Sequence, residues 1–299
     1  MEPADASDSG HSFDLQNYVV LFLDVLGQKE EILRFQLVPD DEDLARRTVR
    51  ETAGIVSMLR DVASTLLDKQ DAESEFMKSL PEEERKNLKN LTRSDVMTQV
   101  LSDALIFSVP IGSDVWDEHS TAMNGVRWAL TVSSWLQLRA LASAHALRGG
   151  LDIGWGVKLG PSEIYGAAFV HAYHLESNTA EYPRVVCGRE LREYLDVVSS
   201  QKWESDFGRN AVDVARHCKS YLFDDDDGER AVDFLGESFR AGARLVPGIE
   251  DMIHRSYSFA QRELRRFTLQ GDEKLTARYG RLATYIENRL PLWNITPRA

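Results

Sequence analysis

The feature that most constrains the fold is a continuous apolar run that ends in a carboxylate. Tyr18 to Leu23 contains only aromatic and aliphatic side chains, and Asp24 follows it directly. A short apolar run without polar alternation is typical of a central strand that is covered on both faces. A carboxylate beside such a strand is rarely buried unless it is paired or binds a cation. The run therefore predicts a buried strand with a chemically important side chain at its end.

A second carboxylate interrupts another apolar segment. We expect a β-hairpin with strands over 95–101 and 104–109 and with Ser102-Asp103 at its tip. If this hairpin lies beside the first strand, Asp24 and Asp103 share one end of the sheet. Two such carboxylates can hold divalent cations, because Mg²⁺ prefers one or two protein carboxylates together with substrate phosphates. The alternative, a helix cap and a turn residue, suits either aspartate alone better than it suits both together.

The residues after the first carboxylate suit a phosphorylated ligand. The carbonyl of Val25 can add a neutral oxygen to the ligands of a hard cation. Gly27 permits a tight turn, and we expect a helix to begin just after it. The amides of Leu26, Gly27 and Gln28 at the start of that helix are then placed for phosphate oxygens.

The charge of the chain excludes some classes of partner. Its 48 acidic and 35 basic residues give a formal net charge of −13, so the general basic surface of a nucleic-acid-binding protein is absent. An acidic protein that acts on a polyanionic substrate needs cations of its own, which agrees with the pair of carboxylates.

The cysteines and the apolar runs indicate the compartment. Cys187 and Cys218 are the two cysteines, too few for a disulfide framework or a zinc motif, and we expect Cys187 to be a buried small hydrophobe. The polar start does not resemble a secretory signal, and no apolar run has membrane-spanning length. We therefore expect a cytoplasmic protein without a membrane partner.

The order of the predicted elements indicates the fold class. With 43% hydrophobic residues, the chain of 299 residues can bury a sizeable core. The order is typical of an α+β fold, a mixed sheet flanked by helices, and it matches the ferredoxin-like pattern with additions. Besides a mobile tail over 1–16 and a charged surface insertion over 68–92, we expect helices over 28–37, 41–67, 116–147, 166–179, 189–198 and 249–290, and strands over 148–160, 184–187, 221–223 and 231–235.

Two further groups of polar residues have simpler interpretations. His171 and His174 are three residues apart on a predicted helix, but no third metal ligand is near in sequence, so polar packing is favoured over zinc. The run Asp224 to Asp227 lacks the alternating ligands of a calcium loop, and we expect a solvated hairpin turn.

The glycines of the strand over 148–160 invite a dinucleotide-binding interpretation. Gly154, Gly156 and Gly160 have the wrong spacing for that motif, and they lie within the strand rather than after it. They more simply permit a close backbone approach by a ligand or a partner chain.

Three blocks of the chain, 18–27, 101–109 and 148–176, resemble the signature segments of class III nucleotide cyclases. The likeness spans 17–190 and implies a catalytic domain over 17–245 that is followed by a helical extension over 246–299. It implies that Asp24 and Asp103, with Val25, bind two divalent cations, Mn²⁺ or Mg²⁺. It also implies a head-to-tail homodimer whose active sites lie at the interface.

The positions that the resemblance assigns to the substrate depart from the family pattern. Gln99 stands where Lys or Glu usually reads the base, and Glu163 falls at the position of its partner. Val170 and His174 replace the Asn and Arg that usually orient the ribose and stabilise the transition state. Either His174 supplies the missing positive charge, or Arg184 replaces it from the neighbouring strand.

The segments Tyr165-Gly166, His174-Leu175-Glu176 and Tyr182-Pro183-Arg184 make the chain most similar to the pyrimidine cyclases of the Pycsar antiphage system. That resemblance implies conversion of UTP to 3′,5′-cyclic UMP and pyrophosphate, with the product read by a separate effector protein. CTP stays open as the substrate, because the amide of Gln99 can both donate and accept. A degenerate nucleotide-binding sensor and a purely structural interaction protein also stay open.

Overall fold

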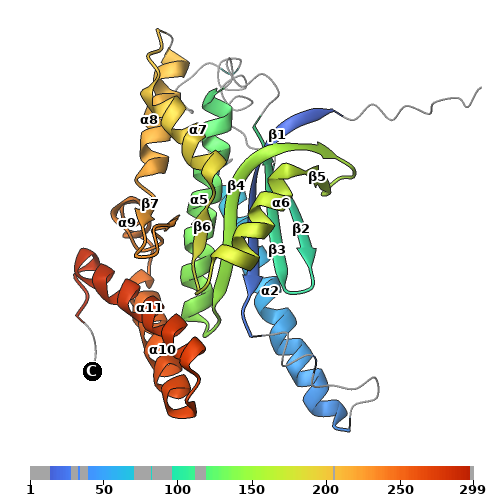
Figure 1. Cartoon of the computed structure of the whole chain (residues 1–299), viewed down its shortest axis with the longest axis vertical. Coiled ribbons are helices and arrows are strands. Elements are labelled where there is room, and N and C mark those ends of the chain that lie inside the picture. Colours follow the sequence, from blue (N-terminus) through green and yellow to red (C-terminus); the bar gives the residue numbers. More distant parts are fainter. Residues whose placement is uncertain are drawn as a thin grey trace, which may run out of the picture.

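The computed structural model describes residues 14–27, 33, 40–70, 82, 96–111, 119–204 and 206–296 (Figure 1). The strands are β1 (Leu15–Val25), β2 (Met97–Leu101), β3 (Ala104–Pro110), β4 (Leu147–Lys158), β5 (Ile164–Gly166), β6 (Val185–Cys187), β7 (Leu222–Asp224) and β8 (Arg230–Val232). The helices are α2 (Glu42–Gln70), α5 (His119–Ala142), α6 (Ala167–His174), α7 (Arg189–Ser200), α8 (Asp206–Lys219), α9 (Glu237–Ala243), α10 (Ile249–Gln270) and α11 (Glu273–Arg289), with a π-helical turn η1 (Leu175–Thr179) and a 3₁₀ turn η2 (Leu290–Trp293).

The strands form one mixed sheet with the order β2-β3-β1-β4-β6-β8-β7, and β5 pairs with β4. β4 and β6 run parallel, whereas β1 is antiparallel to both of its neighbours, β3 and β4. The predicted mixed sheet flanked by helices is therefore confirmed, as is the hairpin of β2 and β3 with its tip at Ser102-Asp103.

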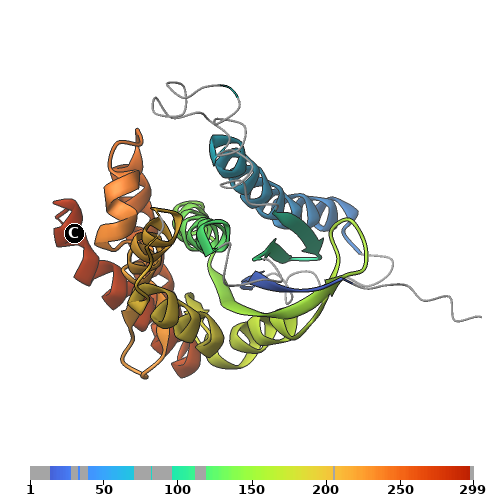
Figure 2. The same cartoon turned by 90° about the horizontal axis from the view of Figure 1, so that it is seen from above.

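β1 lies in the centre of the sheet, and both of its faces are covered. Val19, Leu21 and Leu23 point into the main core together with side chains of α2 and α5. Val20 and Phe22 point the other way, into a smaller core beneath α6. Seen from above, α6 lies on one side of the sheet and α2 and α5 lie on the other (Figure 2). This double coverage explains why the run over 18–23 is apolar throughout instead of alternating.

Glycines of β4 bring α6 unusually close to the sheet. A Cβ atom on Gly150 would lie 2.1 Å from the carbonyl oxygen of Ala172, and one on Gly154 would lie 2.7 Å from the amide nitrogen of Ala168. Only glycine fits at such positions. For Gly154 the prediction of a ligand or partner chain was wrong, because the element that approaches is a helix of the same chain.

Several element boundaries differ from the prediction. The expected tail over 1–16 is too long, since β1 begins at Leu15. The helix expected over 166–179 is α6 followed by the π-helical turn η1, and α8 and α9 were not predicted. The helix expected over 28–37 and most of the insertion over 68–92 lie outside the described residues. No helix in the described part of the chain is long and apolar enough to cross a membrane.

The C-terminal helices α10 and α11 pack into the main core rather than standing apart from it. The hydroxyl of Tyr285 on α11 donates to Asp233 at 2.7 Å and accepts from the amide of Leu235 at 3.0 Å. The indole of Trp293 in η2 donates to the carbonyl of Leu235 at 2.8 Å. These bonds join the end of the chain to the segment that follows β8.

Candidate active site

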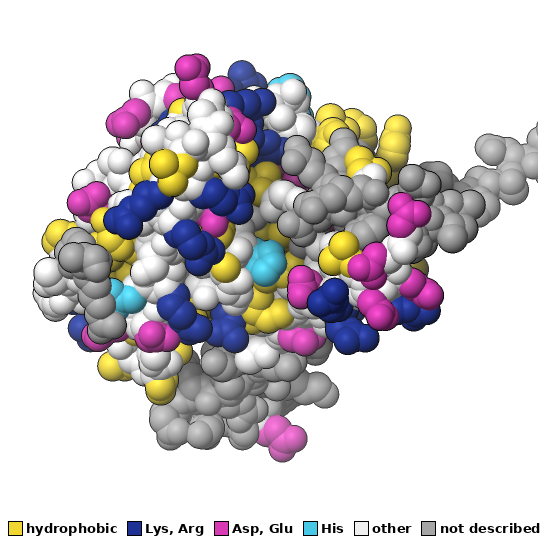
Figure 3. Space-filling view, turned by 90° about the horizontal axis from the view of Figure 1, so that it is seen from below, with side chains coloured by type: hydrophobic (Ala, Val, Ile, Leu, Met, Phe, Trp, Pro, Cys, Tyr) yellow, Lys and Arg dark blue, Asp and Glu magenta, His cyan; other side chains and the backbone are white. Residues whose placement is uncertain are grey.

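The sheet brings the two predicted carboxylates to one end. Asp24, near the end of β1, is in register with Ala104 of β3 on one side and with Arg148 of β4 on the other. Asp103 directly precedes Ala104 in the turn of the β2–β3 hairpin. The strands β1 and β3 meet this end at the lower edge of the sheet in Figure 1, and the face of the molecule seen from below carries interspersed acidic and basic side chains (Figure 3).

A buried ion pair lies beside the two aspartates. The guanidinium of Arg148 donates to Glu176 from Nε at 2.7 Å, and its Nη2 lies 2.5 Å from the same carboxylate oxygen. Glu176 belongs to η1 and is only 4% exposed. Both residues fall within segments that carry the family resemblance, but their pairing was not predicted. Nothing in the spacing of 148 and 176 shows that η1 crosses the start of β4.

The charges around Asp24 are unbalanced. Burial, together with the carboxylates of Glu176 and Asp103, raises the pKa of Asp24 to about 7, although Arg148 acts to lower it. When all four groups are ionised, three carboxylates face one guanidinium, which leaves a net charge of −2. A cation bound beside Asp24 would relieve this repulsion, so the site has the charge that a divalent ion requires.

The described residues supply part of a metal site. Among them, no three or more His, Cys, Asp and Glu side chains are grouped so as to hold an ion. A cation at Asp24 and Asp103 would therefore need backbone or substrate oxygens as well, which Mg²⁺ accepts readily. The side chain of Val25 is 2% exposed and packs in the main core, so only its backbone carbonyl, directly after Asp24, is available as a metal ligand.

The amides proposed for phosphate are not equally available. The amide of Leu26 donates to the carbonyl of Ala146 at 2.9 Å, so it is already used within the chain. Gly27 is exposed and has a φ of 89°, the left-handed region that favours glycine. Gln28 lies outside the described residues. Of the three predicted phosphate-binding amides, Gly27 alone lies in an exposed position that the structure describes.

The two predicted base-reading residues lie at different ends of the sheet. Gln99 on β2 is in register with Ile106, close to the two aspartates and on the face that α6 covers. Glu163 is exposed and precedes Ile164, which pairs with Lys158 at the far end of β4. Ten residues of extended strand separate positions 148 and 158, or roughly 33 Å. One chain therefore does not bring Glu163 to Asp24.

Val170 and His174 lie on the outer surface of α6. Val170 is 60% exposed, and the ring of His174 is exposed with its Nδ1 3.2 Å from the amide nitrogen of Asn178. His171 points elsewhere, since its Nδ1 lies 3.7 Å from the carboxylate of buried Asp152. The two histidines do not converge on a common point, in agreement with the favoured interpretation of polar packing.

The structure contradicts the suggestion that Arg184 supplies catalytic charge. Its side chain is 3% exposed and forms ion pairs with Asp225 and with Asp227, the latter at 2.6 Å. Its Nη2 also donates to the carbonyl of Thr179 at 3.1 Å. These bonds occupy Nη1 and Nη2 of the guanidinium in a network that joins the start of β6 to the β7–β8 turn. The predicted acidic hairpin turn is present and largely exposed, but it is not merely solvated, because two of its carboxylates bind a buried arginine.

Comparisons with known proteins add little to this geometry. No protein-family model matches the chain, and no curated protein matches it. A solved structure of a bacterial light-regulated adenylyl cyclase aligns with 81% of this chain and 99% of its own, at 11% sequence identity and a TM-score of 0.36. A likeness at that TM-score carries no argument about function, and the functional conclusion therefore depends on the site itself.

Proposed function

We propose that this protein is a class III nucleotide cyclase that converts UTP to 3′,5′-cyclic UMP and pyrophosphate, as the second-messenger synthase of an antiphage system. The observation that carries the proposal is the convergence of Asp24 and Asp103 in a site with excess negative charge. The strand order β2-β3-β1-β4 supports a ferredoxin-like cyclase domain, since this is the order that a split βαβ pattern produces.

The carboxylates are assigned to cation binding. Asp24 and Asp103, with the carbonyl of Val25, would hold Mn²⁺ or Mg²⁺ against the substrate triphosphate. When bound, such ions lower the pKa of the ribose 3′-hydroxyl and neutralise charge on the phosphates. These residues suit a divalent cation, because its positive charge would reduce the repulsion between Asp24 and the carboxylates of Glu176 and Asp103.

The reaction is intramolecular, so the chain contributes chiefly by positioning the substrate. The ribose O3′ attacks the α-phosphorus and loses its proton to solvent, while the bond from the α-phosphorus to the bridging oxygen breaks. Pyrophosphate leaves with the electron pair of that bond. The exposed backbone around Gly27 lies next to the carboxylates, where it can contact phosphate oxygens.

The base is assigned to residues of both chains. Because Glu163 lies at the end of the sheet opposite Asp24, we propose a head-to-tail homodimer in which the second chain provides Glu163, whereas Gln99 lies near the carboxylates of its own chain. Apolar side chains exposed on β5 and α6 support such an interface, among them Tyr165 at 67% and Val170 at 60%. His174, exposed on the same helix, is the remaining candidate for positive charge at the phosphates.

The most specific part of the proposal is the choice of uracil over cytosine as the base of the substrate. The amide of Gln99 can donate to the carbonyl of uracil or accept from the amine of cytosine, so cyclic CMP is the alternative product. The product would act through a separate effector protein. We assign no role to nucleic acid.

The proposal is tested by incubating the full-length protein with each of the four nucleoside triphosphates and Mn²⁺. We expect pyrophosphate and cyclic UMP, identified by mass spectrometry, from the wild type and from the control Asp14→Asn at the other end of β1. Asp24→Asn and Asp103→Asn should yield no product while remaining folded. Product from Asp103→Asn at the wild-type rate would refute the role of the carboxylates. Metal-dependent nucleotide binding without turnover would favour the degenerate sensor, and no nucleotide binding would favour a structural protein.

A further inference from the structure

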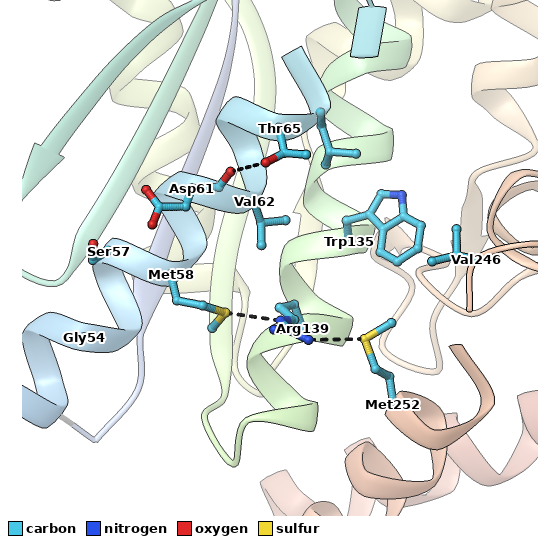
Figure 4. Close-up of a pocket in the computed structure, with 11 residues that line it drawn as sticks. Gly54, Ser57, Met58, Asp61, Val62, Thr65, Trp135, Arg139, Val246 and Met252 are labelled. Carbon is cyan, nitrogen blue, oxygen red and sulfur yellow. Dashed lines mark hydrogen bonds between the residues drawn. The ribbon is translucent and has the colours of Figure 1, made fainter. Parts of the chain in front are cut away.

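A second candidate site lies on the helical side of the molecule, away from the carboxylates. It is a cavity of about 630 Å³ between α2, α5 and the start of α10, and we call it the α2–α5–α10 groove (Figure 4). Small-molecule sites commonly have volumes of roughly 300 to 1,000 Å³. Its walls include Asp61, Val62 and Leu66 of α2, Trp135 and Arg139 of α5, and Met252 of α10.

The groove contains a guanidinium that forms no ion pair with any carboxylate of the described residues. Arg139 lies between two thioethers, with its Nε 3.4 Å from the sulfur of Met58 and its Nη1 3.8 Å from the sulfur of Met252 (Figure 4). A thioether is a weak acceptor that carries no charge. Asp61 also lines the groove, but in Figure 4 its carboxylate points away from the guanidinium.

The remaining walls determine what else the ligand must carry. Val62, Leu66 and Trp135 present apolar surface on either side of Arg139. A guanidinium on an apolar wall recognises a planar carboxylate through two parallel hydrogen bonds, and these strengthen where water is excluded. One positive group balances one negative charge, and the carboxylate of Asp61 at the same groove disfavours a dianion.

We propose that the α2–α5–α10 groove binds an amphipathic monocarboxylate, with the carboxylate on Arg139 and the apolar body against Val62, Leu66 and Trp135. None of the groove-lining residues belongs to the candidate active site, and the assignment does not depend on the nucleotide chemistry proposed above. The ligand is a small molecule with one acidic group and a flexible or aromatic apolar part.

The test uses decanoate as the probe and the full-length protein in titration calorimetry. The matched variants are Arg139→Met, which keeps a long apolar side chain, and the control Arg127→Met, an exposed arginine on the same helix. Decanoate should bind the wild type and the control equally and should bind Arg139→Met about tenfold or more weakly, because a charge-assisted pair is lost. Decanol, which lacks the charge, should bind wild type and Arg139→Met alike and weakly.

Two further measurements keep the assignment falsifiable if Arg139→Met folds poorly. Thr65→Trp fills the groove from an exposed position and should abolish decanoate binding without altering the circular dichroism spectrum. Decanoate should also change the fluorescence of the wild type but change that of Trp135→Phe much less. The proposal is overturned if decanoate does not bind, if decanol binds as tightly as decanoate, or if decyl phosphate binds more tightly than either.

Discussion

Replacing Asp24 by Asn should stabilise the protein at alkaline pH, although it removes a residue that the proposed chemistry needs. In the unfolded chain this carboxyl ionises near pH 4. In the folded chain burial, Glu176 and Asp103 raise its pKa to about 7. The folded state therefore retains a proton that the unfolded state has lost, so the stability from this group is complete below about pH 4 and decreases as the pH rises to about 7.

The size of the effect follows from the shift in pKa. A difference of about three pKa units corresponds to about 4 kcal/mol at about 1.4 kcal/mol per unit. Because the side chain of Asp24 is only partly buried, solvent screening reduces this to about 2 kcal/mol. Asn cannot ionise, so Asp24→Asn should exceed the wild type in free energy of unfolding by about 2 kcal/mol at pH 8 and by almost nothing at pH 4.

Urea unfolding between pH 4 and pH 8 measures this difference. Asp14→Asn is the matched control, because Asp14 precedes the same strand and is exposed. The stability of this control should follow the wild type at every pH. Added Mn²⁺ should stabilise the wild type at pH 8 but leave Asp24→Asn unchanged, since the ion would neutralise the same repulsion. An Asp24→Asn variant that is less stable than the wild type at pH 8 would refute the electrostatic reasoning.

Three other substitutions test separate parts of the structure. Asp103→Asn should lower the pKa of Asp24, measured from its carboxyl ¹³C shift by NMR, because one of the charges that raise it is removed; an unchanged titration would contradict the proximity of the two groups. Gly150→Ala should destabilise the fold by about 2 kcal/mol or more in urea unfolding, since its Cβ would meet a carbonyl oxygen at 2.1 Å, whereas Gly242→Ala has open space and should not. Arg184→Met should cost about 3 kcal/mol in thermal unfolding, because Asp225 and Asp227 lose their buried partner and keep only the ion pairs with Arg281, and a variant that folds normally but loses only turnover would instead support the catalytic role rejected above.

The strands that carry the two aspartates could be predicted from the sequence because their signals are local. The apolar run before Asp24 and the two-residue turn at Ser102-Asp103 each specify a strand end without reference to the rest of the chain. The pairing of Arg148 with Glu176 could not be predicted in this way. It depends on how η1 crosses β4, which no local pattern records.

The error at Arg184 has the same origin. The sequence places Arg184 just before β6, next to the strand that begins with Arg148, and the neighbouring backbone indeed pairs as expected. Adjacency in the sheet does not decide where a long side chain points. Arg184 reaches away from Asp24 to the β7–β8 turn, whose aspartates are about 40 residues further along the chain.

The small residues of β4 and the charge of the site are connected. Because Gly150 has no side chain, the end of α6 approaches the strand closely enough for the amide of Glu176 to lie 3.0 Å from where a Cβ would be. That approach places the carboxylate of Glu176 beside Arg148 and near Asp24, where it raises the pKa of Asp24. Arg148 is thereby paired with a carboxylate and offers little positive charge to a phosphate. The positive charge for a triphosphate at this end of the sheet must then come from bound cations, from His174 or from a second chain, and all three are testable parts of the function proposed here.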